Sequence, residues 1–392
     1  MSKWICHKCM EVYDNSRVEN RRCPSCGSPD IEAYHFSNSD AFLSKKVPMV
    51  IEERKRLGLE GLVGGLQAVI INTEPDRLKT SAEELQRYTG LAFDGAFEDE
   101  DGATCVLRVD GSADFLVRAR KGNHNPFAYF NTHRKSAHLP NTRLETFVFK
   151  TTGLEKYVEI QRQRGVAFMT RDIVRRKNYS FIQTMPSRMT GNSLGFIQWH
   201  GKEGNYSPGL TGMLDWTMEK PDRPYLRSIK ELDHTATRMA ARDRDAAIIE
   251  FMELTNYNFE FAIYVRLFNS ITSVARLSGE GYAAVFTSGI FPYISDEISG
   301  PTEKFVENYG TRVHHIAFNT DDIEKTYDGL ARDGLTYMIA LVGSREEGLK
   351  QTFTNPSPNT LLVNEYIHRY DGFDGFFTRS NVTHLTGATD RQ

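Results

Sequence analysis

The stretch RVHHIAFNT, residues 312–320, decides the fold because close copies of it occur elsewhere in the chain. Three other segments align with its last eight residues without gaps: LQAVIINT (66–73), LETFVFKT (144–151) and LDHTATRM (232–239). Each reads as a β-strand, in which neighbouring side chains point to opposite faces of a sheet. Repetition at four places predicts four copies of one structural unit.

A helical pattern follows each of these four segments. The patterns cover residues 80–93, 152–168, 244–259 and 321–335. In the last of them, apolar residues share one face behind an aspartate N-cap. Further strand-like runs come after the helices, for example 282–289 and 360–368. We therefore predict an α+β fold of four βαβββ modules, paired into two domains of curved sheets covered by helices.

Two of the four segments carry a histidine at the same position, His234 and His315, where the other two carry Ala68 and Thr146. Each of these histidines shares a strand face with an alanine two residues further on. His314 is expected to point to the opposite face and to be structural. A single histidine of this kind is usually a satisfied core residue. Two in register across a repeat instead indicate one shared metal site.

A third metal ligand is offered by Glu365, which lies in the otherwise apolar run NTLLVNEYIH. A carboxylate that points into a sheet interior is costly unless it is paired or binds a metal. The alternative is a glutamate on the outer face of its strand. Two histidines and one carboxylate with open positions form the usual non-haem Fe(II) site. We therefore predict that His234, His315 and Glu365 bind Fe(II) or another divalent metal.

Composition and charge exclude several classes of protein. Of 392 residues, 40% are hydrophobic and 25% charged, and the net charge is -3. A nucleic-acid or membrane-surface protein would show a basic excess. No apolar run reaches the roughly 18 residues of a membrane helix, and the N-terminus has no apolar signal core. A cytoplasmic protein is expected.

Four of the five cysteines form two C-x-x-C pairs near the N-terminus: Cys6, Cys9, Cys23 and Cys26. Four thiolates from two tight turns form a closed tetrahedral cage that suits zinc or iron. Cys105, in a strand-like run, is expected to be a buried structural residue.

The runs KWICHKCMEVYD and CPSCGSPDIEAYHF resemble the short rubredoxin-type module at the end of rubrerythrins. The aromatic residue before the first cysteine, the later tyrosine and the C-P-x-C-G-x-P run all match. The family's glycine after the first knuckle is Met10 here. The resemblance implies iron, whereas the departure favours a zinc-ribbon-like structural site, so both metals remain open. An iron site could exchange electrons with a redox partner.

These features predict four regions. Residues 1–36 form the four-cysteine module, and 37–60 form a linker with a helix that begins at Pro48 and ends at Gly61. Residues 61–225 form a degenerate domain without metal, and 226–392 form the metal-binding catalytic domain.

The second half resembles 4-hydroxyphenylpyruvate dioxygenase and its relatives in the vicinal oxygen chelate (glyoxalase-like) superfamily. The similar runs are LDHTA, SGPTEKFVENYGTRVHHIAF, LKQTFTNP and NEYIHRYDGFDGFF, within residues 228–378. The resemblance implies that the iron ligands fall on His234, His315 and Glu365. It also assigns a glutamine beside the substrate to Gln351, and it assigns the two rings that sandwich the substrate to Phe353 and Phe377.

Three positions depart from that family. Polar residues that hold its substrate are replaced by Ala283, Ile294 and Pro301. A site built to hydrogen-bond one substrate discriminates strongly when its partners are lost. We therefore expect the metal chemistry to persist and the substrate to differ, with an aromatic or cyclic acid compatible with the two phenylalanines.

The favoured function is a non-haem Fe(II)-dependent dioxygenase that acts on a 2-oxo acid or a related chelating small acid, with O2 as co-substrate. One alternative is a divalent-metal lyase, isomerase or epimerase of the same superfamily, which would need no oxygen. Another is a protein that binds a small ligand without turnover. The resemblance also implies a homo-oligomer.

Overall fold

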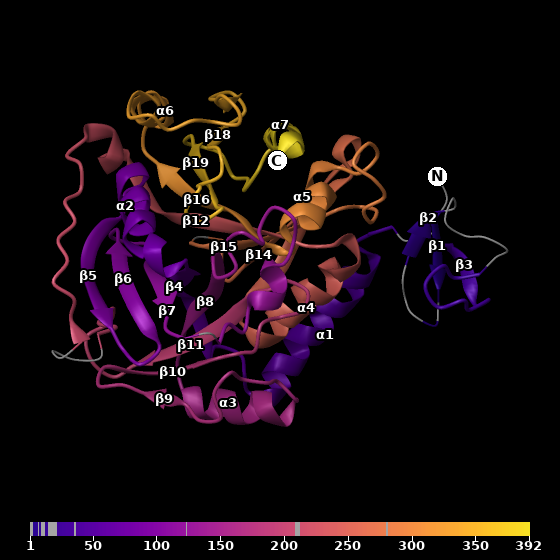
Figure 1. Cartoon of the computed structure of the whole chain (residues 1–392), viewed down its shortest axis with the longest axis horizontal. Coiled ribbons are helices and arrows are strands. Elements are labelled where there is room, and N and C mark those ends of the chain that lie inside the picture. The colour runs from indigo at the N-terminus through magenta and orange to yellow at the C-terminus, as the bar shows by residue number, and fades with distance from the viewer. Residues whose placement is uncertain are drawn as a thin grey trace.

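A small N-terminal sheet lies to one side of two large sheets in the computed structural model (Figure 1). The structure describes residues 3–6, 8, 12–14, 22–34, 37–122, 124–207, 212–279 and 281–392. The small sheet consists of β1 (Lys3–Cys6), β2 (Val12–Asp14) and β3 (Ile31–Tyr34). Both β2 and β3 pair antiparallel with β1, which lies between them.

Two eight-stranded sheets form the rest of the fold. The amino-terminal sheet contains β4 (Val63–Asn72), β5 (Ala92–Glu98), β6 (Gly102–Arg108), β7 (Asp114–Arg120), β8 (Arg143–Thr151), β9 (Val174–Arg175), β10 (Tyr179–Gln183) and β11 (Ser193–Trp199). The carboxyl-terminal sheet contains β12 (Ile229–Arg238), β13 (Asn258–Val265), β14 (Ser270–Arg276), β15 (Ala283–Ser288), β16 (Arg312–Thr320), β17 (Val342–Ser344), β18 (Leu349–Phe353) and β19 (Val363–Arg369). Their orders are β5-β6-β7-β4-β8-β11-β10-β9 and β13-β14-β15-β12-β16-β19-β18-β17, so the second sheet repeats the topology of the first.

A helix follows the first strand of each module, as the sequence predicts. These helices are α2 (Leu78–Tyr88), α3 (Leu154–Gln163), α4 (Arg244–Leu254) and α6 (Ile323–Arg332), and Asp322 caps α6 by accepting a bond from the Lys325 N–H. Each helix ends several residues before the predicted pattern does. In α4, for example, Thr255 is already extended. The predicted α+β architecture of four βαβββ modules is confirmed.

The repeated segments are the central strands of the two sheets. In the first sheet β4 pairs antiparallel with β8, and in the second β12 pairs antiparallel with β16. Both pairs contain register shifts, and the last shift in each falls at the same point of the repeat. There the pairing skips Glu145 in β8 and His314 in β16. Such a β-bulge turns side chains away from strict alternation.

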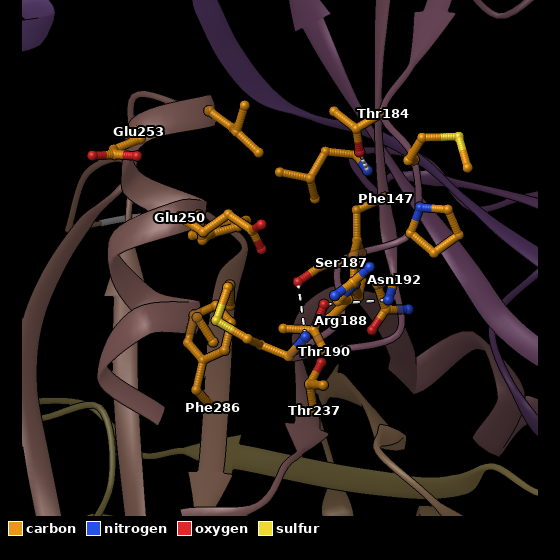
Figure 2. Close-up of a pocket in the computed structure, with 18 of the residues that line it drawn as sticks. Phe147, Thr184, Ser187, Arg188, Thr190, Asn192, Thr237, Glu250, Glu253 and Phe286 are labelled. Carbon is orange, nitrogen blue, oxygen red and sulfur yellow. Dashed lines mark hydrogen bonds between the residues drawn. The ribbon is translucent and has the colours of Figure 1, made fainter. Parts of the chain in front are cut away.

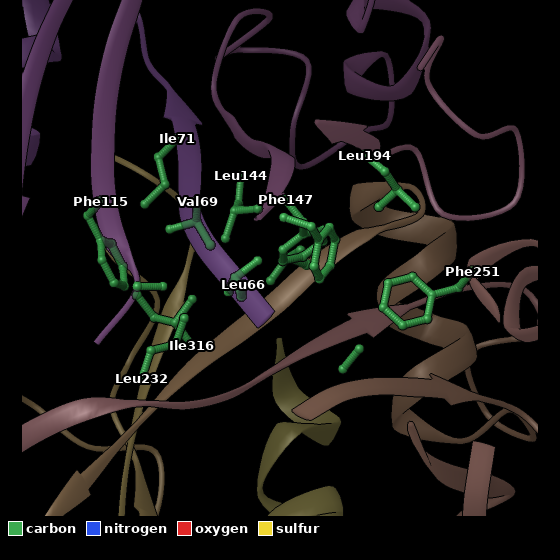
Figure 3. Close-up of a cluster of buried hydrophobic side chains, with 14 of the residues drawn as sticks. Leu66, Val69, Ile71, Phe115, Leu144, Phe147, Leu194, Leu232, Phe251 and Ile316 are labelled. Atoms are coloured by element: carbon green, nitrogen blue, oxygen red, sulfur yellow. The ribbon is translucent and has the colours of Figure 1, made fainter. Parts of the chain in front are cut away.

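One hydrophobic core joins the two halves of the molecule. Figure 3 shows side chains from both sheets and from α4 meeting in it. Phe149 on β8 contacts the rings of Phe251 and Tyr257, with centroids 5.9 and 5.4 Å apart. On β4, Val69 and Ile71 belong to this core, whereas Ala68 and Ile70 face the other side of the sheet. Each sheet therefore has one face that packs in the shared core. The opposite face lines the hollow of that curved sheet, which we call its cup.

The linker helix differs from the prediction. α1 (Ala41–Leu57) begins before Pro48, which lies inside it, and its C-cap is Gly58 in the left-handed conformation. The missing N–H of Pro48 costs one helical bond, but buried residues on both sides of it, Leu43 and Val50, keep the helix docked. Among the described residues, no helix is long and apolar enough to cross a membrane.

Candidate metal centre

The three predicted metal ligands meet on the cup face of the carboxyl-terminal sheet. Ala317 on β16 pairs with His234 on β12 and with Glu365 on β19, and His315 lies two residues before it. Residues two apart share a face, so all three side chains project into the same cup. The small alanines at 236 and 317 leave room for the rings to converge.

The ligand atoms lie close enough for one ion. Glu365 Oε2 is 3.1 Å from His234 Nε2 and 3.3 Å from His315 Nε2. All candidate ligand atoms lie within 4.8 Å of one another, and the three residues are buried. Two imidazole nitrogens and a carboxylate oxygen are donors that suit a divalent transition metal, and His₂-carboxylate sets leave positions open for other ligands.

Two nearby carboxylates favour the protonated, positively charged form of the His234 ring. Burial alone lowers the pKa of this imidazole, but the carboxylates of Glu365 and Asp233 outweigh burial and raise it to about 9. For His315, burial is the largest cause that lowers the pKa well below its usual value, and the nearby imidazoles act in the same direction. His315 is therefore neutral at pH 7 and has a lone pair available for a metal.

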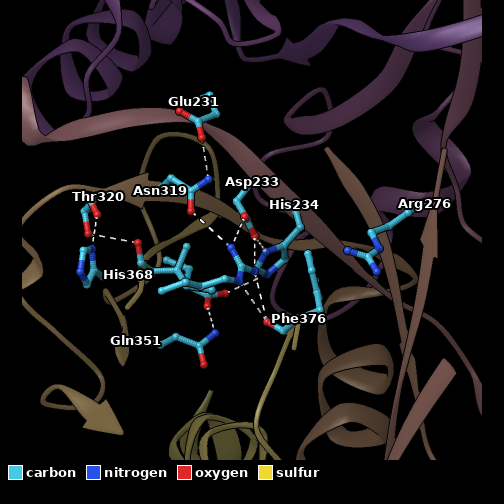
Figure 4. A network of polar contacts seen from close by, with 12 residues as sticks. Glu231, Asp233, His234, Arg276, Asn319, Thr320, Gln351, His368 and Phe376 are labelled. Carbon is cyan, nitrogen blue, oxygen red and sulfur yellow. Dashed lines mark hydrogen bonds and ion pairs between the residues drawn. The ribbon is translucent and has the colours of Figure 1, made fainter. Parts of the chain in front are cut away.

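Each ligand is held in place by another side chain. Asp233 accepts a bond from His234 Nδ1 at 2.6 Å and is itself bound by the guanidinium of Arg369 (Figure 4). Gln351 donates to Glu365 Oε1 and accepts from Asn381 on α7 (Arg379–Ala388). Hydrogen bonds of this kind to metal ligands fix ring orientation and metal affinity. The sequence analysis placed Gln351 beside a substrate rather than on Glu365, and it did not single out Asp233.

His314 is not separated from the centre, contrary to the prediction. Because it lies in the β16 bulge, its Nδ1 is 2.8 Å from His315 Nδ1, and its Nε2 is 2.7 Å from Gln392 Oε1. Burial lowers its pKa well below the usual value, so a neutral His314 can share one proton with His315 across this contact. Strict alternation along the strand could not predict this bulge.

The two predicted phenylalanines flank the centre. The Phe353 ring lies 4.8 Å from that of His315, and the Phe377 ring lies 5.1 Å from that of His234. The pocket above the ligands has a volume of only about 40 Å³, and residues of α7 such as Leu385 line it. Small-molecule sites usually hold roughly 300–1,000 Å³, so this pocket is smaller than most of them.

Arg238 also lines this pocket, and sequence reasoning did not single it out. It is 5% exposed, and its Nη2 donates to Thr389 Oγ1 at 2.8 Å. Its Nη1 is buried without a hydrogen-bond partner. Burial lowers its pKa to about 9, which reflects the lack of a nearby acid. Burying a guanidinium whose N–H groups lack partners costs folding free energy unless an anion binds to it.

The positions that depart from the dioxygenase family have ordinary structural roles. Ala283 pairs with His234 from β15 and is fully buried. Pro301 is the first residue of α5 (Pro301–Tyr309), a position that tolerates proline, and Ile294 lies in the preceding loop. None of the three offers a polar side chain to a substrate.

The amino-terminal sheet has no equivalent metal ligands among its described residues. By register, Ala68, Thr146 and Gly195 occupy the places of His234, His315 and Glu365. A Cβ added to Gly195 would come within 2.8 Å of the Phe181 ring, so a carboxylate does not fit there without a shift.

A larger cavity of about 580 Å³ lies between the two halves, away from the three ligands (Figure 2). It is reached by Thr235 and Thr237, the β12 residues on the face opposite His234. Glu250 on α4 lines it, and burial raises the pKa of that carboxyl. Judged by volume alone, this cavity would be the candidate active site. The three potential metal ligands instead favour the smaller pocket.

Three of the four predicted cysteine ligands also lie together. The sulfurs of Cys6, Cys23 and Cys26 fall within 4.8 Å of one another, and Cys6 Sγ is 3.6 Å from Cys26 Sγ. Cys9 lies outside the described residues. Cys105 is fully buried on β6, as predicted, and burial raises the pKa of its thiol to about 12.

Comparisons with known proteins support the fold. No family model matches the sequence, and no curated protein matches it. The structure is similar to that of a triple mutant of 4-hydroxymandelate synthase from Streptomyces coelicolor, with TM-score 0.61 and 16% identity over 84% of this chain and 99% of that one. It is also similar to a fusion of a xylose isomerase-like TIM barrel with 4-hydroxyphenylpyruvate dioxygenase, with TM-score 0.59 and 13% identity over 89% of this chain. The match spans 58% of the fusion protein's length. At these identities the likeness establishes the paired-module fold.

Proposed function

We propose that the protein is a non-haem Fe(II)-dependent oxygenase whose metal is held by His234, His315 and Glu365. The convergence of two imidazoles and one buried carboxylate in a closed cup carries this proposal. The orienting bonds from Asp233 and Gln351 support it, because an incidental cluster has no need of them. The solved structures of similar fold bear the names of 4-hydroxymandelate synthase and 4-hydroxyphenylpyruvate dioxygenase, which agree with it.

The chain's own residues would bind and orient the substrate. A bound Fe(II) would supply the open coordination positions and the redox chemistry that reaction with O2 needs. The three ligands would hold it at one side of the pocket, and Phe353 and Phe377 would exclude water.

The substrate is an acid in this proposal. Arg238 Nη1 is the one described guanidinium nitrogen in the pocket that is both buried and without a partner, and a carboxylate would satisfy it. Hydroxyls of Ser270, Thr287 and Thr302 line the same pocket. These polar groups would hold the substrate where Ala283 and Pro301 offer it no hydrogen bond. A 2-oxo acid could then present its carboxylate and keto oxygens to Arg238 and the metal.

Oxygen consumption tests the proposal. Protein loaded anaerobically with Fe(II) would be mixed with phenylpyruvate or 2-oxobutyrate, and O2 uptake and CO2 release would be followed together. We expect both gases to change with the same stoichiometry for at least one acid, and neither to change with Glu365→Ala. Turnover that continues without O2 would instead identify a lyase or isomerase.

We further propose that Cys6, Cys9, Cys23 and Cys26 bind one iron or zinc ion. Three converging sulfurs support this proposal. An absorbance band in the visible region after purification would identify iron and an electron-transfer role, whereas colourless protein with one zinc per module would identify a structural site.

A further inference from the structure

The amino-terminal half contains a cavity of about 520 Å³ over the cup face of its sheet. None of its lining residues lines the pocket of the metal centre. We propose that this cavity is a second binding site, for an aromatic monocarboxylic acid. The proposal does not depend on the function assigned to the metal centre.

The floor of the cavity is apolar and spans four strands. It is formed by one buried residue from each of β4, β7, β8 and β11: Ile70, Leu116, Val148 and Ile197. Rings of Phe97, Tyr179 and Phe181 form the walls. A volume in this range and an apolar, ring-lined interior are typical of small-molecule sites. They suit a ligand with an aromatic body.

Two arginines stand at one end of the apolar floor. They follow Leu116 along β7 with the strand period of two, so Leu116, Arg118 and Arg120 share the cup face. Arg118 Nε and Arg120 Nη1 are buried without a hydrogen-bond partner. Each such donor loses its hydration and gains nothing in return. Both arginines line the cavity, so a carboxylate bound in it would lie close to two positive charges.

Acids in the lining favour a ligand with one negative charge over a ligand with two, although His124 and Lys121, which pairs with Glu98, also line the cavity. Arg120 Nη2 is paired with buried Glu145, and Arg118 Nη2 lies 3.6 Å from exposed Asp101. Glu100 pairs with Arg176, and Asp99 lies beside them in the lining. These acids around the cavity would repel a second carboxylate, so a monoacid fits better than a diacid.

Each of the two sheets has an arginine on its cup face at the same position of the strand register. Arg118 on β7 pairs with Asn72 on β4, and the corresponding pair in the second half is Thr287 on β15 with Arg238 on β12. The two arginines lie on neighbouring rather than equivalent strands, but each faces the cup of its own sheet. A guanidinium is therefore available in the cup that has no metal ligands.

Calorimetric titration with 4-phenylbutyrate tests the proposal. The titration would use the full chain with Arg238→Met as background, which removes the guanidinium proposed to bind an acid at the other site. We expect saturable binding of one acid per chain. We expect Arg118→Met to weaken it by about tenfold or more, since a charge-assisted bond is lost. The partner of Arg118 is exposed, so this variant leaves no buried charge. Arg227→Met is the matched control, because Arg227 is exposed and paired with Asp222.

A second variant tests the location of the binding site without changing any charge. Gln183 lines the cavity and is partly exposed, so the larger side chain in Gln183→Trp would take up part of the space and weaken binding. The neutral analogue 4-phenylbutan-1-ol should bind at least tenfold more weakly than the acid. Equal binding of acid and alcohol, unchanged binding in Arg118→Met, or no saturable binding to the parent protein would overturn the proposal.

Discussion

Gln351 is expected to orient one of the three proposed metal ligands, Glu365. It donates to the carboxylate oxygen of Glu365 that does not face the histidines, and Asn381 holds it in turn. The geometry predicts that Gln351→Leu weakens the affinity for a divalent metal by roughly 10–100-fold, because Glu365 loses its orienting bond. Competition with a coloured chelator measures this. Gln163→Leu, on the exposed end of α3, is the control and should leave the affinity unchanged.

Arg238 is expected to act on substrate rather than on the metal. Arg238→Met should raise KM for an acid substrate by about tenfold or more and change kcat much less, because it removes one charge-assisted bond to the carboxylate. Metal content should stay at the wild-type level, and Arg238→Lys should recover part of the loss. A variant with normal KM and low kcat would show that Arg238 does not bind substrate.

At this scale the sequence pointed to the three residues that converge in the carboxyl-terminal sheet, but not to their surroundings. The register of the repeat pointed to His234 and His315, and the acid in an apolar strand run pointed to Glu365; the structure brings all three together. The roles of Asp233 and His314 depend on β-bulges, which no alternating pattern predicts. Arg238 sits at the end of its strand, where an arginine is usually solvated, so only the folded structure reveals its burial.

Among the elements, α1 is the one whose role differs most from the prediction. The sequence suggested a connector, but α1 packs on α4, and Arg54 from its last turn is buried there. Arg54 donates to the carbonyl of Met252 in α4 and to the carbonyls of Thr255 and Tyr257 just after it. The predicted start of the helix was wrong because proline at a first helical position is the commoner pattern.

Arg54→Met should therefore destabilise the fold by about 2–4 kcal/mol, since several buried carbonyls lose their donor. Urea unfolding followed by circular dichroism measures the change. Arg56 provides the matched control, because it is exposed on the same turn and is paired with Glu53. We expect Arg56→Met to change stability by less than about 0.5 kcal/mol. Similar losses in the two variants would mean that α1 is only a connector.

For the whole molecule, the shared core predicts that the two halves unfold together. Phe149→Ala on β8 removes a ring that contacts Phe251 and Tyr257 across the interface and should cost about 3–5 kcal/mol. Hydrogen exchange should then lose protection in β12 and β19 as well as in β4. Loss confined to residues 63–199 would show that the halves unfold independently. The sequence predicted the paired modules, but the side chains that join them are ordinary apolar residues with no distinctive pattern.

Metal content tests the central claim most directly. Wild type and Glu365→Ala would be purified anaerobically and their metals counted per chain, with Glu324→Ala as an exposed-glutamate control in the same half. We predict that Glu365→Ala loses one metal ion per chain and that the control loses none. Any metal bound by the cysteines should remain in all three proteins. Equal metal content in wild type and Glu365→Ala would contradict the assignment of His234, His315 and Glu365 as a metal centre.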